Sequence, residues 1–237
     1  DADGRWLGVP GFVMVAARGT APNASAFARG PLAEASAEDR ARMLAQVMQA
    51  LVRVHQTDVS AAGLDDFMMN APGETAMQRY VNWYWRSWEW FQLPEYARLL
   101  PVQRWLVANA PSGKPELLHG DASLHNYLFD GARLVGMLDW EMSTLGRAEA
   151  DLALQCVGNA LFAAPRDSGV PQPPGEAQWL EMYQRAGGRA LHDFDYFKKL
   201  ANYLVIVCIY GLQRHLPAEA RRAQDPLLNR CWAQLEA

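Results

Sequence analysis

The chain has 237 residues, of which 50% are apolar and 20% are charged, and it carries a formal net charge of −4. This length suits one large domain or two small ones, and the composition is ordinary for a globular protein. The chain has no extended run of Lys or Arg, so we expect no nucleic-acid partner. Its longest apolar run, residues 203–212, is about half as long as a bilayer requires, so we expect no membrane attachment.

The cysteines and the first residues indicate where the protein resides. Cys156, Cys208 and Cys231 are odd in number and far apart, which matches neither a disulfide framework nor a paired-cysteine metal site. We therefore expect reduced thiols and a cytoplasmic location. Residues 1–5 include neither an initiating Met nor a secretion signal, so we expect the chain to begin partway into a longer protein.

The N-terminal quarter of the chain predicts a strand, a connector and a helix. The apolar run over residues 12–17 predicts a strand. Residues 19–32 are rich in Ala, Gly, Pro and Ser and predict a connector. Ser36 is a favourable N-cap with acids just behind it, and apolar residues then recur at helical spacing as far as His55.

The rest of the chain reads as helices that flank a small β region. Three short strands are expected at 116–119, 127–129 and 134–138. Asp130-Gly131, between the last two strands, is a strong hairpin signal. Further helices are expected over about 74–92, 94–109, 148–163, 176–187, 193–215 and 218–235. The fold class that these elements predict is α+β, dominated by helix.

Two acids and an amide lie at the ends of the short apolar runs: Asp121, Asn126 and Asp139. An unpaired charge is costly to bury, so buried strands do not normally end in bare carboxylates. A divalent cation that carries phosphate would use this charge, because Mg²⁺ takes few protein carboxylates and completes its shell with water and phosphate oxygens. Asp121 would then face a different substrate atom, an arrangement that suits phosphoryl transfer.

The motif His119-x-Asp121-x4-Asn126, followed by Asp139 after a hairpin, resembles a known set of catalytic segments. They belong to the aminoglycoside phosphotransferase and choline kinase branch of the protein-kinase-like fold. The closer resemblance is to phosphotransferase domains fused to, or encoded beside, acyl-CoA dehydrogenases. Those domains carry similar motifs in the order found here: Leu138-Asp-Trp-Glu141, Thr144-Leu-Gly146 and Asp151-Leu-Ala153. The resemblance covers residues 6–160 well and the helical tail more loosely.

The resemblance implies a kinase-like C-terminal lobe and a role for each of five residues. Asp121 resembles the catalytic base that orients the acceptor hydroxyl. Asn126 and Asp139 resemble the Mg²⁺ ligands. His119 resembles a residue that braces the catalytic loop, and Asp151 resembles the buried acid that holds this loop from below.

The run over residues 12–17 resembles the hinge strand of such kinases. Met14 would lie at the back of the adenine pocket, and the backbone of Val15 and Ala17 would face the adenine edge. Kinase-like folds also hold the phosphates with a Gly-rich loop and a strand Lys. The chain contains no such pair. We infer that most of the N-terminal lobe lies outside the chain, and we expect the chain alone to bind nucleotide poorly and to be inactive.

On this basis we divide the chain into two parts. Residues 1–19 are a remnant of the N-terminal lobe with the hinge, and residues 20–237 are the helical C-terminal lobe, with a catalytic β insert at about 116–141. One catalytic-loop position departs from the family pattern. Many relatives have a basic residue two positions after the catalytic Asp, where this chain has Ser123. His125 is a candidate to replace that charge, and a plain loop role is the alternative.

The resulting functional hypothesis is an ATP- and Mg²⁺-dependent phosphotransferase that acts on a hydroxyl of a small molecule. The resemblance favours a hydroxyacyl or carboxylic substrate and a functional link to an acyl-CoA dehydrogenase. The alternatives are an aminoglycoside-type antibiotic kinase and a catalytically silent binding or regulatory module. His119, Asp121 and His125 also have a spacing that a zinc site would use, although no other histidine has a matching position.

Several other residues have plainer expectations. We expect His55 to be a packed residue at a helix end rather than a ligand. We expect Arg147 and Glu149 to be solvated. The aromatic helix at 74–92 is expected to be core and packing surface, and an aromatic wall for an apolar substrate is the alternative.

Overall fold

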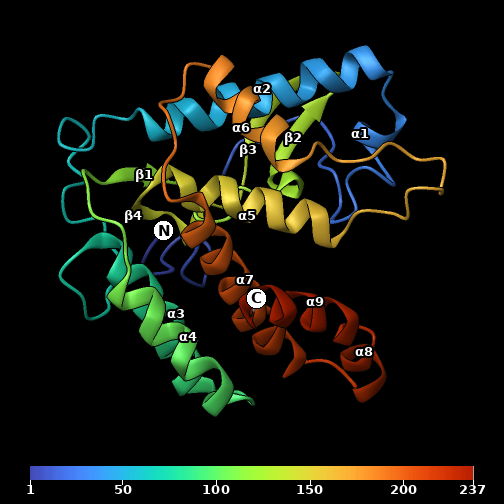
Figure 1. Cartoon of the computed structure of the whole chain (residues 1–237). Coiled ribbons are helices and arrows are strands. Elements are labelled where there is room, and N and C mark those ends of the chain that lie inside the picture. The colour runs from blue at the N-terminus through green and yellow to red at the C-terminus, as the bar shows by residue number, and fades with distance from the viewer. Residues whose placement is uncertain (237) are drawn as a thin grey trace.

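The structure, a computed structural model, describes residues 1–236 and consists mainly of helices around two small antiparallel sheets (Figure 1). The helices before the sheets are α1 (Pro31–Glu34), α2 (Ala37–His55), α3 (Ala76–Phe91) and α4 (Tyr96–Ala108). Those after the sheets are α5 (Ala148–Leu161), α6 (Glu176–Arg185), α7 (Phe194–Gln213), α8 (Ala218–Arg222) and α9 (Asp225–Glu236). The predicted α+β, helix-dominated fold class is therefore confirmed.

The sheets bring the ends of the short strands together. β1 (Glu116–Leu118) pairs antiparallel with β4 (Thr144–Gly146), and β2 (Tyr127–Asp130) pairs antiparallel with β3 (Arg133–Met137). The 3-10 turn η1 (Leu124–Asn126) leads into β2, and η2 (Trp140–Met142) comes after β3. The predicted hairpin turn is present, and its Gly131 takes a φ of 57°. The polar residues at the strand ends therefore lie close together in the chain's only β region within residues 1–236.

Local sequence signals account for the long helices. The hydroxyl of Ser36 accepts a hydrogen bond from the backbone N–H of Asp39, so the predicted cap of α2 is confirmed. Thr75 and Gln78 cap α3 reciprocally, which satisfies two N–H groups that the helix start would leave unpaired. α2 buries the apolar face that its spacing predicted, and α3 buries four aromatic side chains but leaves Trp90 exposed.

Two groups of buried side chains form the core, and α5 lies between them (Figure 1). Side chains of α3, α4, α7 and α9 form the first group. Side chains of α2, α6 and β2 form the second. α5 contributes Ala150 and Ala153 to the first group and Ala148 and Leu152 to the second. Both cores therefore hold α5 in place, and α5 in turn supports the strand ends.

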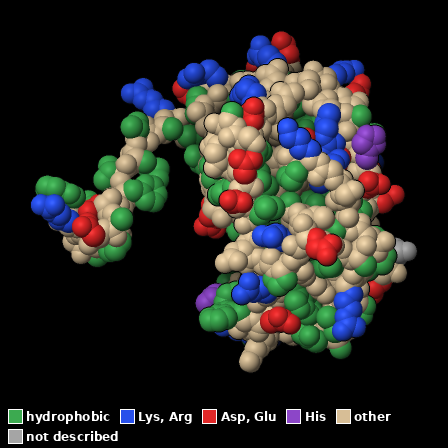
Figure 2. All heavy atoms as spheres, turned by 90° about the vertical axis from the view of Figure 1, so that its left-hand side faces the viewer, with side chains coloured by type: hydrophobic (Ala, Val, Ile, Leu, Met, Phe, Trp, Pro, Cys, Tyr) green, Lys and Arg blue, Asp and Glu red, His purple; other side chains and the backbone are tan. Residues whose placement is uncertain are grey.

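The strand predicted over residues 12–17 is wrong. The segment is irregular and pairs with no strand among residues 1–236. Figure 2 shows the N-terminal segment as an arm that extends away from the body, and Phe12, Met14 and Val15 are 77%, 71% and 94% exposed. An apolar run becomes a strand only beside a partner backbone. The first residue that finds one is Thr20, which exchanges hydrogen bonds of 2.7 and 3.0 Å with Phe129.

Two further differences concern short elements. The helix predicted over 218–235 is divided into α8 and α9. β4 was not predicted, because three residues are too short to show an alternating pattern. None of the helices among the described residues has the length and apolarity to span a bilayer, and all three cysteines are free thiols.

Candidate active site

The turn after β1 carries His119, Gly120 and Asp121, and a buried carboxylate on α5 holds it from below. Asp151 is 1% exposed and accepts hydrogen bonds from the backbone N–H of His119 at 2.8 Å and of Gly120 at 2.9 Å. Gly120 has a φ of 84°, and a Cβ at this position would collide with the carbonyl oxygen of Met142. Glycine is therefore required at position 120 for the turn to close onto Asp151.

His55 and Tyr183 extend this buried network away from the turn. His55 Nε2 lies 3.1 Å from Asp151 Oδ2, and His55 Nδ1 lies 2.9 Å from the hydroxyl oxygen of Tyr183. A buried carboxylate needs partners for its lone pairs, and His55 completes the set that the two turn N–H groups begin. His55 is thus packed at the helix end, as expected. Its bonding role had no signal in the sequence, because its partners are 96 and 128 residues away.

His119 connects the end of β1 to the end of β3. Its Nε2 lies 2.8 Å from the carbonyl oxygen of Leu138, and a carbonyl can only accept, so Nε2 carries the hydrogen. Nδ1 then accepts from the backbone N–H of Asp121 at 3.3 Å. The ring also packs against Trp140, with 4.6 Å between ring centroids. These contacts are those of a bracing residue, and they leave neither nitrogen of His119 free to bind a metal.

The carboxylate of Asp121 lies at the surface of this turn among polar partners. Ser123 donates its hydroxyl to Oδ1 at 2.5 Å, and His125 Nε2 lies 3.6 Å from Oδ2. Burial raises the pKa of Asp121, but the interactions with His125 and Ser123 outweigh burial and lower this pKa to about 2. The Asp121 carboxylate in turn raises the pKa of His125. Asp121 is therefore ionised at neutral pH and lies beside a group that favours a positive charge.

Asn126 and Asp139 lie on either side of a backbone contact between the two segments. The side-chain N–H₂ group of Asn126 donates to the backbone oxygen of Asp121 at 2.9 Å and to its Oδ2 at 3.1 Å, which leaves the amide oxygen of Asn126 for another partner. Asp139 takes a left-handed φ of 64°, and the N–H of the preceding Leu138 donates to the Asn126 carbonyl at 2.7 Å. One amide oxygen and one carboxylate, brought near each other in this way, are oxygen donors that fit a Mg²⁺ ion.

The zinc-type alternative is not assembled in the structure. Within residues 1–236, no three or more side chains of His, Cys, Asp or Glu gather so that they could hold a metal ion. His119 is occupied by backbone partners, while His125 lies beside Asp121.

The expectation that Arg147 and Glu149 are solvated is wrong for Glu149, which is 0% exposed. Arg189 lies between Glu149 and Glu116 and makes hydrogen bonds of 2.6 Å to each of them. Burial raises the pKa of Glu149, but hydrogen bonds from Arg189 and from the backbone N–H of His192 outweigh burial and lower this pKa to about 2. This cluster ties the first turn of α5 to β1 and to the segment before α7. The sequence did not indicate it, because Arg189 is 40 residues from Glu149.

The hinge residues are placed apart from this cluster of acids. Met14, Val15 and Ala17 lie on the exposed arm, and none of the hydrogen bonds among residues 1–236 links residues 12–17 to residues 119–139. The structure therefore gathers Asp121, Ser123, His125 and Asn126 but does not bring the predicted adenine contacts to them.

The helical lobe, the buried acid beneath the turn and the acids at the strand ends define a kinase-like small-molecule phosphotransferase fold. Its sequence matches the model of the phosphotransferase enzyme family over residues 12–198, and the chain belongs to this family. The structure is similar to a protein of Ralstonia eutropha JMP134 whose assigned name places it among the aminoglycoside phosphotransferases. The TM-score is 0.70 at 21% identity, over 94% of this chain and 71% of that one.

Other relatives agree on the fold and differ in what their names say they do. A choline/ethanolamine kinase family protein from Mesorhizobium loti has a TM-score of 0.52 at 19% identity, over 84% of this chain and 65% of that one. Acyl-CoA dehydrogenase family member 10 of Mus musculus is 32% identical over 190 residues, which are 74% of this chain and 17% of that protein. Member 11 of Mus musculus is 26% identical over 81% of this chain and 26% of that protein. The chain thus spans only a small part of these curated relatives.

Proposed function

We propose that this chain carries the acceptor- and metal-binding half of a small-molecule kinase that transfers the γ-phosphoryl group of ATP to a hydroxyl. The observation that carries the proposal is the Asp121 carboxylate, which is held ionised beside the amide of Asn126. Phosphoryl transfer requires mainly positioning and charge neutralisation, so a weakly basic carboxylate that orients the acceptor hydroxyl is sufficient. Asp121 would accept the hydrogen bond of that hydroxyl and point its oxygen at the phosphorus.

Asn126 and Asp139 would hold Mg²⁺ through one amide and one carboxylate oxygen. When bound, Mg²⁺ supplies positive charge that neutralises the phosphate oxygens during transfer. His119 and Asp151 would act indirectly, since they fix the backbone on which Asp121 is mounted. His125 would place a proton-bearing group near the transferred phosphate and so replace the basic residue that Ser123 lacks.

The nucleotide base would be bound by the arm over residues 12–17, which we retain as the hinge between the proposed parts 1–19 and 20–237. The exposed apolar side chains of Met14 and Val15 suit the face of a purine, and the backbone of Val15 and Ala17 offers groups for its edge. These contacts are proposals, as are ATP itself and a cytoplasmic location.

For the acceptor we propose a hydroxyacyl or carboxylic compound and a functional link to an acyl-CoA dehydrogenase. The names of the relatives, acyl-CoA dehydrogenase family members 10 and 11, support this class. The similarity to structures named as aminoglycoside phosphotransferases supports the alternative, an antibiotic kinase. A catalytically silent module is the second candidate. It is favoured by Ser123, whose hydroxyl already occupies one oxygen of Asp121.

The test is ATP consumption by the full natural protein, screened with hydroxyacyl-CoAs, amino alcohols and aminoglycosides. We expect turnover with the first class, and we expect Asp121→Ala and Asp139→Ala to abolish it while leaving the circular dichroism spectrum unchanged. Asp130→Ala, an exposed acid in the adjacent hairpin, is the matched control and should retain turnover. Full turnover in the Asp121→Ala protein would refute the proposed role. No turnover with any acceptor would favour the silent module.

A further inference from the structure

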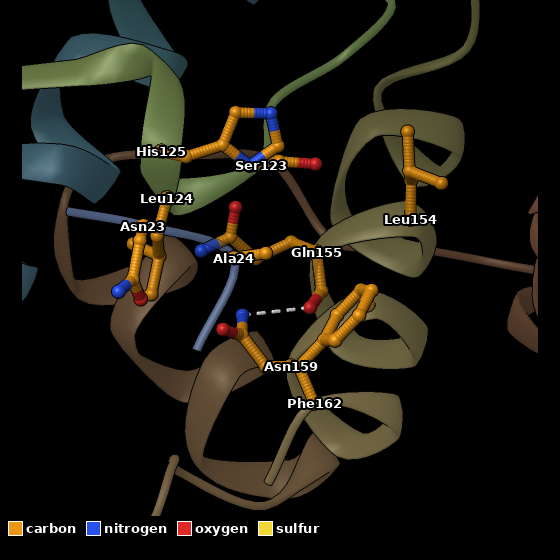
Figure 3. Close-up of a pocket in the computed structure, with 10 residues that line it drawn as sticks. Asn23, Ala24, Ser123, Leu124, His125, Leu154, Gln155, Asn159 and Phe162 are labelled. Atoms are coloured by element: carbon orange, nitrogen blue, oxygen red, sulfur yellow. Dashed lines mark hydrogen bonds between the residues drawn. The ribbon is translucent and has the colours of Figure 1, made fainter. Parts of the chain in front are cut away.

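A small pocket opens beside the catalytic turn, on the side formed by α5 (Figure 3). Its walls are the Ser123–His125 segment, Asn23 and Ala24 of the connector, and the C-terminal half of α5. It encloses an empty volume of about 310 Å³, which is room for a few non-hydrogen atoms of a ligand. Figure 3 shows the side chain of Gln155 running from α5 into the space between Ala24 and the Ser123–His125 segment.

Gln155 is the unusual feature of this pocket. It is 1% exposed, and neither its side-chain nitrogen nor its side-chain oxygen has a hydrogen-bond partner among residues 1–236. Asn159, one turn further along α5, does not satisfy it, because its amide donates to the backbone oxygen of Gln155 at 2.7 Å. A buried donor or acceptor without a partner costs about 1–3 kcal/mol. An amide left in this state and directed into a pocket is suited to bind a ligand group that can satisfy it.

The lining determines what kind of group fits. The described residues around the pocket include no Asp, Glu, Lys or Arg, and several of them are apolar, Leu154 and Phe162 among them. His125 is the one side chain there that can carry charge, and its Nε2 lies 3.6 Å from Asp121. A ligand ammonium would therefore find no carboxylate in the pocket. A neutral group that both donates and accepts would pair with both ends of the Gln155 amide, at little desolvation cost.

The pocket also adjoins the reacting group of the proposed kinase. Ser123 and His125, which line it, are the same side chains that contact the two oxygens of Asp121. A molecule whose hydroxyl lies at Asp121 would therefore reach the pocket with an adjacent part of its structure.

We propose that this pocket selects the acceptor by binding an uncharged group of it, a carboxamide or second hydroxyl next to an apolar carbon chain, with Gln155 as the specificity-determining residue. The word acceptor rests on the proposed kinase function, but binding of the neutral group does not. The pocket thereby favours neutral amides and alcohols over polycationic acceptors.

The experiment is a titration of the full, ¹⁵N-labelled chain followed by NMR, without ATP. The Gln155 side-chain NH₂ signals are assigned by their loss in Gln155→Leu. The probes are 3-hydroxybutanamide, which is neutral, and ethanolamine, which is a cation. We expect 3-hydroxybutanamide to shift the Gln155 signals and ethanolamine to leave them in place. In Gln155→Leu the affinity for 3-hydroxybutanamide should fall at least tenfold, while the melting temperature should not fall, since the variant removes an unpaired buried amide.

The control is Gln213→Leu, the same change at a buried glutamine whose amide donates to the backbone oxygen of Arg221 at 3.3 Å. It should bind 3-hydroxybutanamide as the wild type does. Unshifted Gln155 signals, equal affinity in Gln155→Leu, or a preference for ethanolamine would overturn the inference and leave a pocket that holds only water. Because no ATP is present, probe binding at Gln155 in a protein that never turns over ATP would refute the kinase proposal and leave this one standing.

Discussion

The imidazole of His55 lies 3.1 Å from the carboxylate of Asp151, and each side chain is 1% exposed. The same carboxylate accepts the backbone N–H groups of His119 and Gly120. One buried acid therefore joins the end of α2 to the turn that carries Asp121. The geometry of the proposed active site depends on contacts that no substrate touches.

Replacement of that acid should be strongly destabilising. Asp151→Ala leaves two buried backbone N–H groups and the His55 ring without a partner, so we expect the free energy of unfolding to fall by about 3–5 kcal/mol. Urea denaturation followed by circular dichroism measures this. Asp195→Ala, at the exposed start of α7, is the control and should cost no more than about 1 kcal/mol. Similar losses in the two variants would contradict the role of Asp151.

Glycine at position 120 should be irreplaceable. Gly120→Ala places a Cβ against the Met142 carbonyl at a φ of 84°, so we expect a loss of at least about 2 kcal/mol of stability and a large loss of ATP turnover in the full protein. Gly131→Ala provides the comparison, because Gly131 also has a positive φ but no atom within 4 Å of the added Cβ. It should cost about 1 kcal/mol and retain turnover. If Gly131→Ala proved as damaging as Gly120→Ala, the collision would not be the cause.

Stability should fall at acid pH through the Glu149 carboxylate. Its pKa is about 2 in the folded protein and about 4.3 when unfolded, so the folded state is favoured above pH ~4.3 and this advantage is lost as the pH falls toward 2. The contribution is roughly 2–3 kcal/mol at neutral pH. Urea unfolding from pH 7 to pH 3 should show wild type and Glu149→Gln converging as the pH falls. A constant difference between them would exclude this linkage.

The proposed metal ligands should control the Mg²⁺ requirement. In the full protein, Asn126→Ala removes one oxygen donor, so we expect the Mg²⁺ concentration for half-maximal ATP turnover to rise at least tenfold. Asn109→Ala removes an amide at the end of α4 that bonds only to the backbone oxygen of Trp105, and it should leave the Mg²⁺ dependence unchanged. An unchanged requirement in Asn126→Ala would remove Asn126 from the proposed site.

How far the sequence was sufficient depends on the distance over which each feature is determined. Asp121, Asn126 and Asp139 lie within 20 residues of one another, and their placement at strand ends was visible from local pattern alone. The same holds for the Ser36 cap and for the hairpin at Gly131. Glu149 was misjudged because its partner Arg189 is far away in the chain, and no local pattern distinguishes a solvated acid from one paired in this way.

The segment over residues 12–17 shows a second limit. Its composition favours a strand, but a strand also requires a neighbouring backbone, and none is available to it among residues 1–236. The empty pocket at Gln155 is a third case. A glutamine in a helix is ordinary, and its isolation became visible only once the surrounding side chains were in place.

α5 carries Asp151 near its start and Gln155 one turn later, and the two cores of the protein press on it from both sides. Any tilt of this helix would displace the base-bearing turn and the floor of the pocket together. A new acceptor preference could not be obtained by shifting the helix without also misaligning Asp121. Variation in acceptor choice among related chains should therefore appear as changes of side chain at position 155 and around it, on a helix axis that stays where it is.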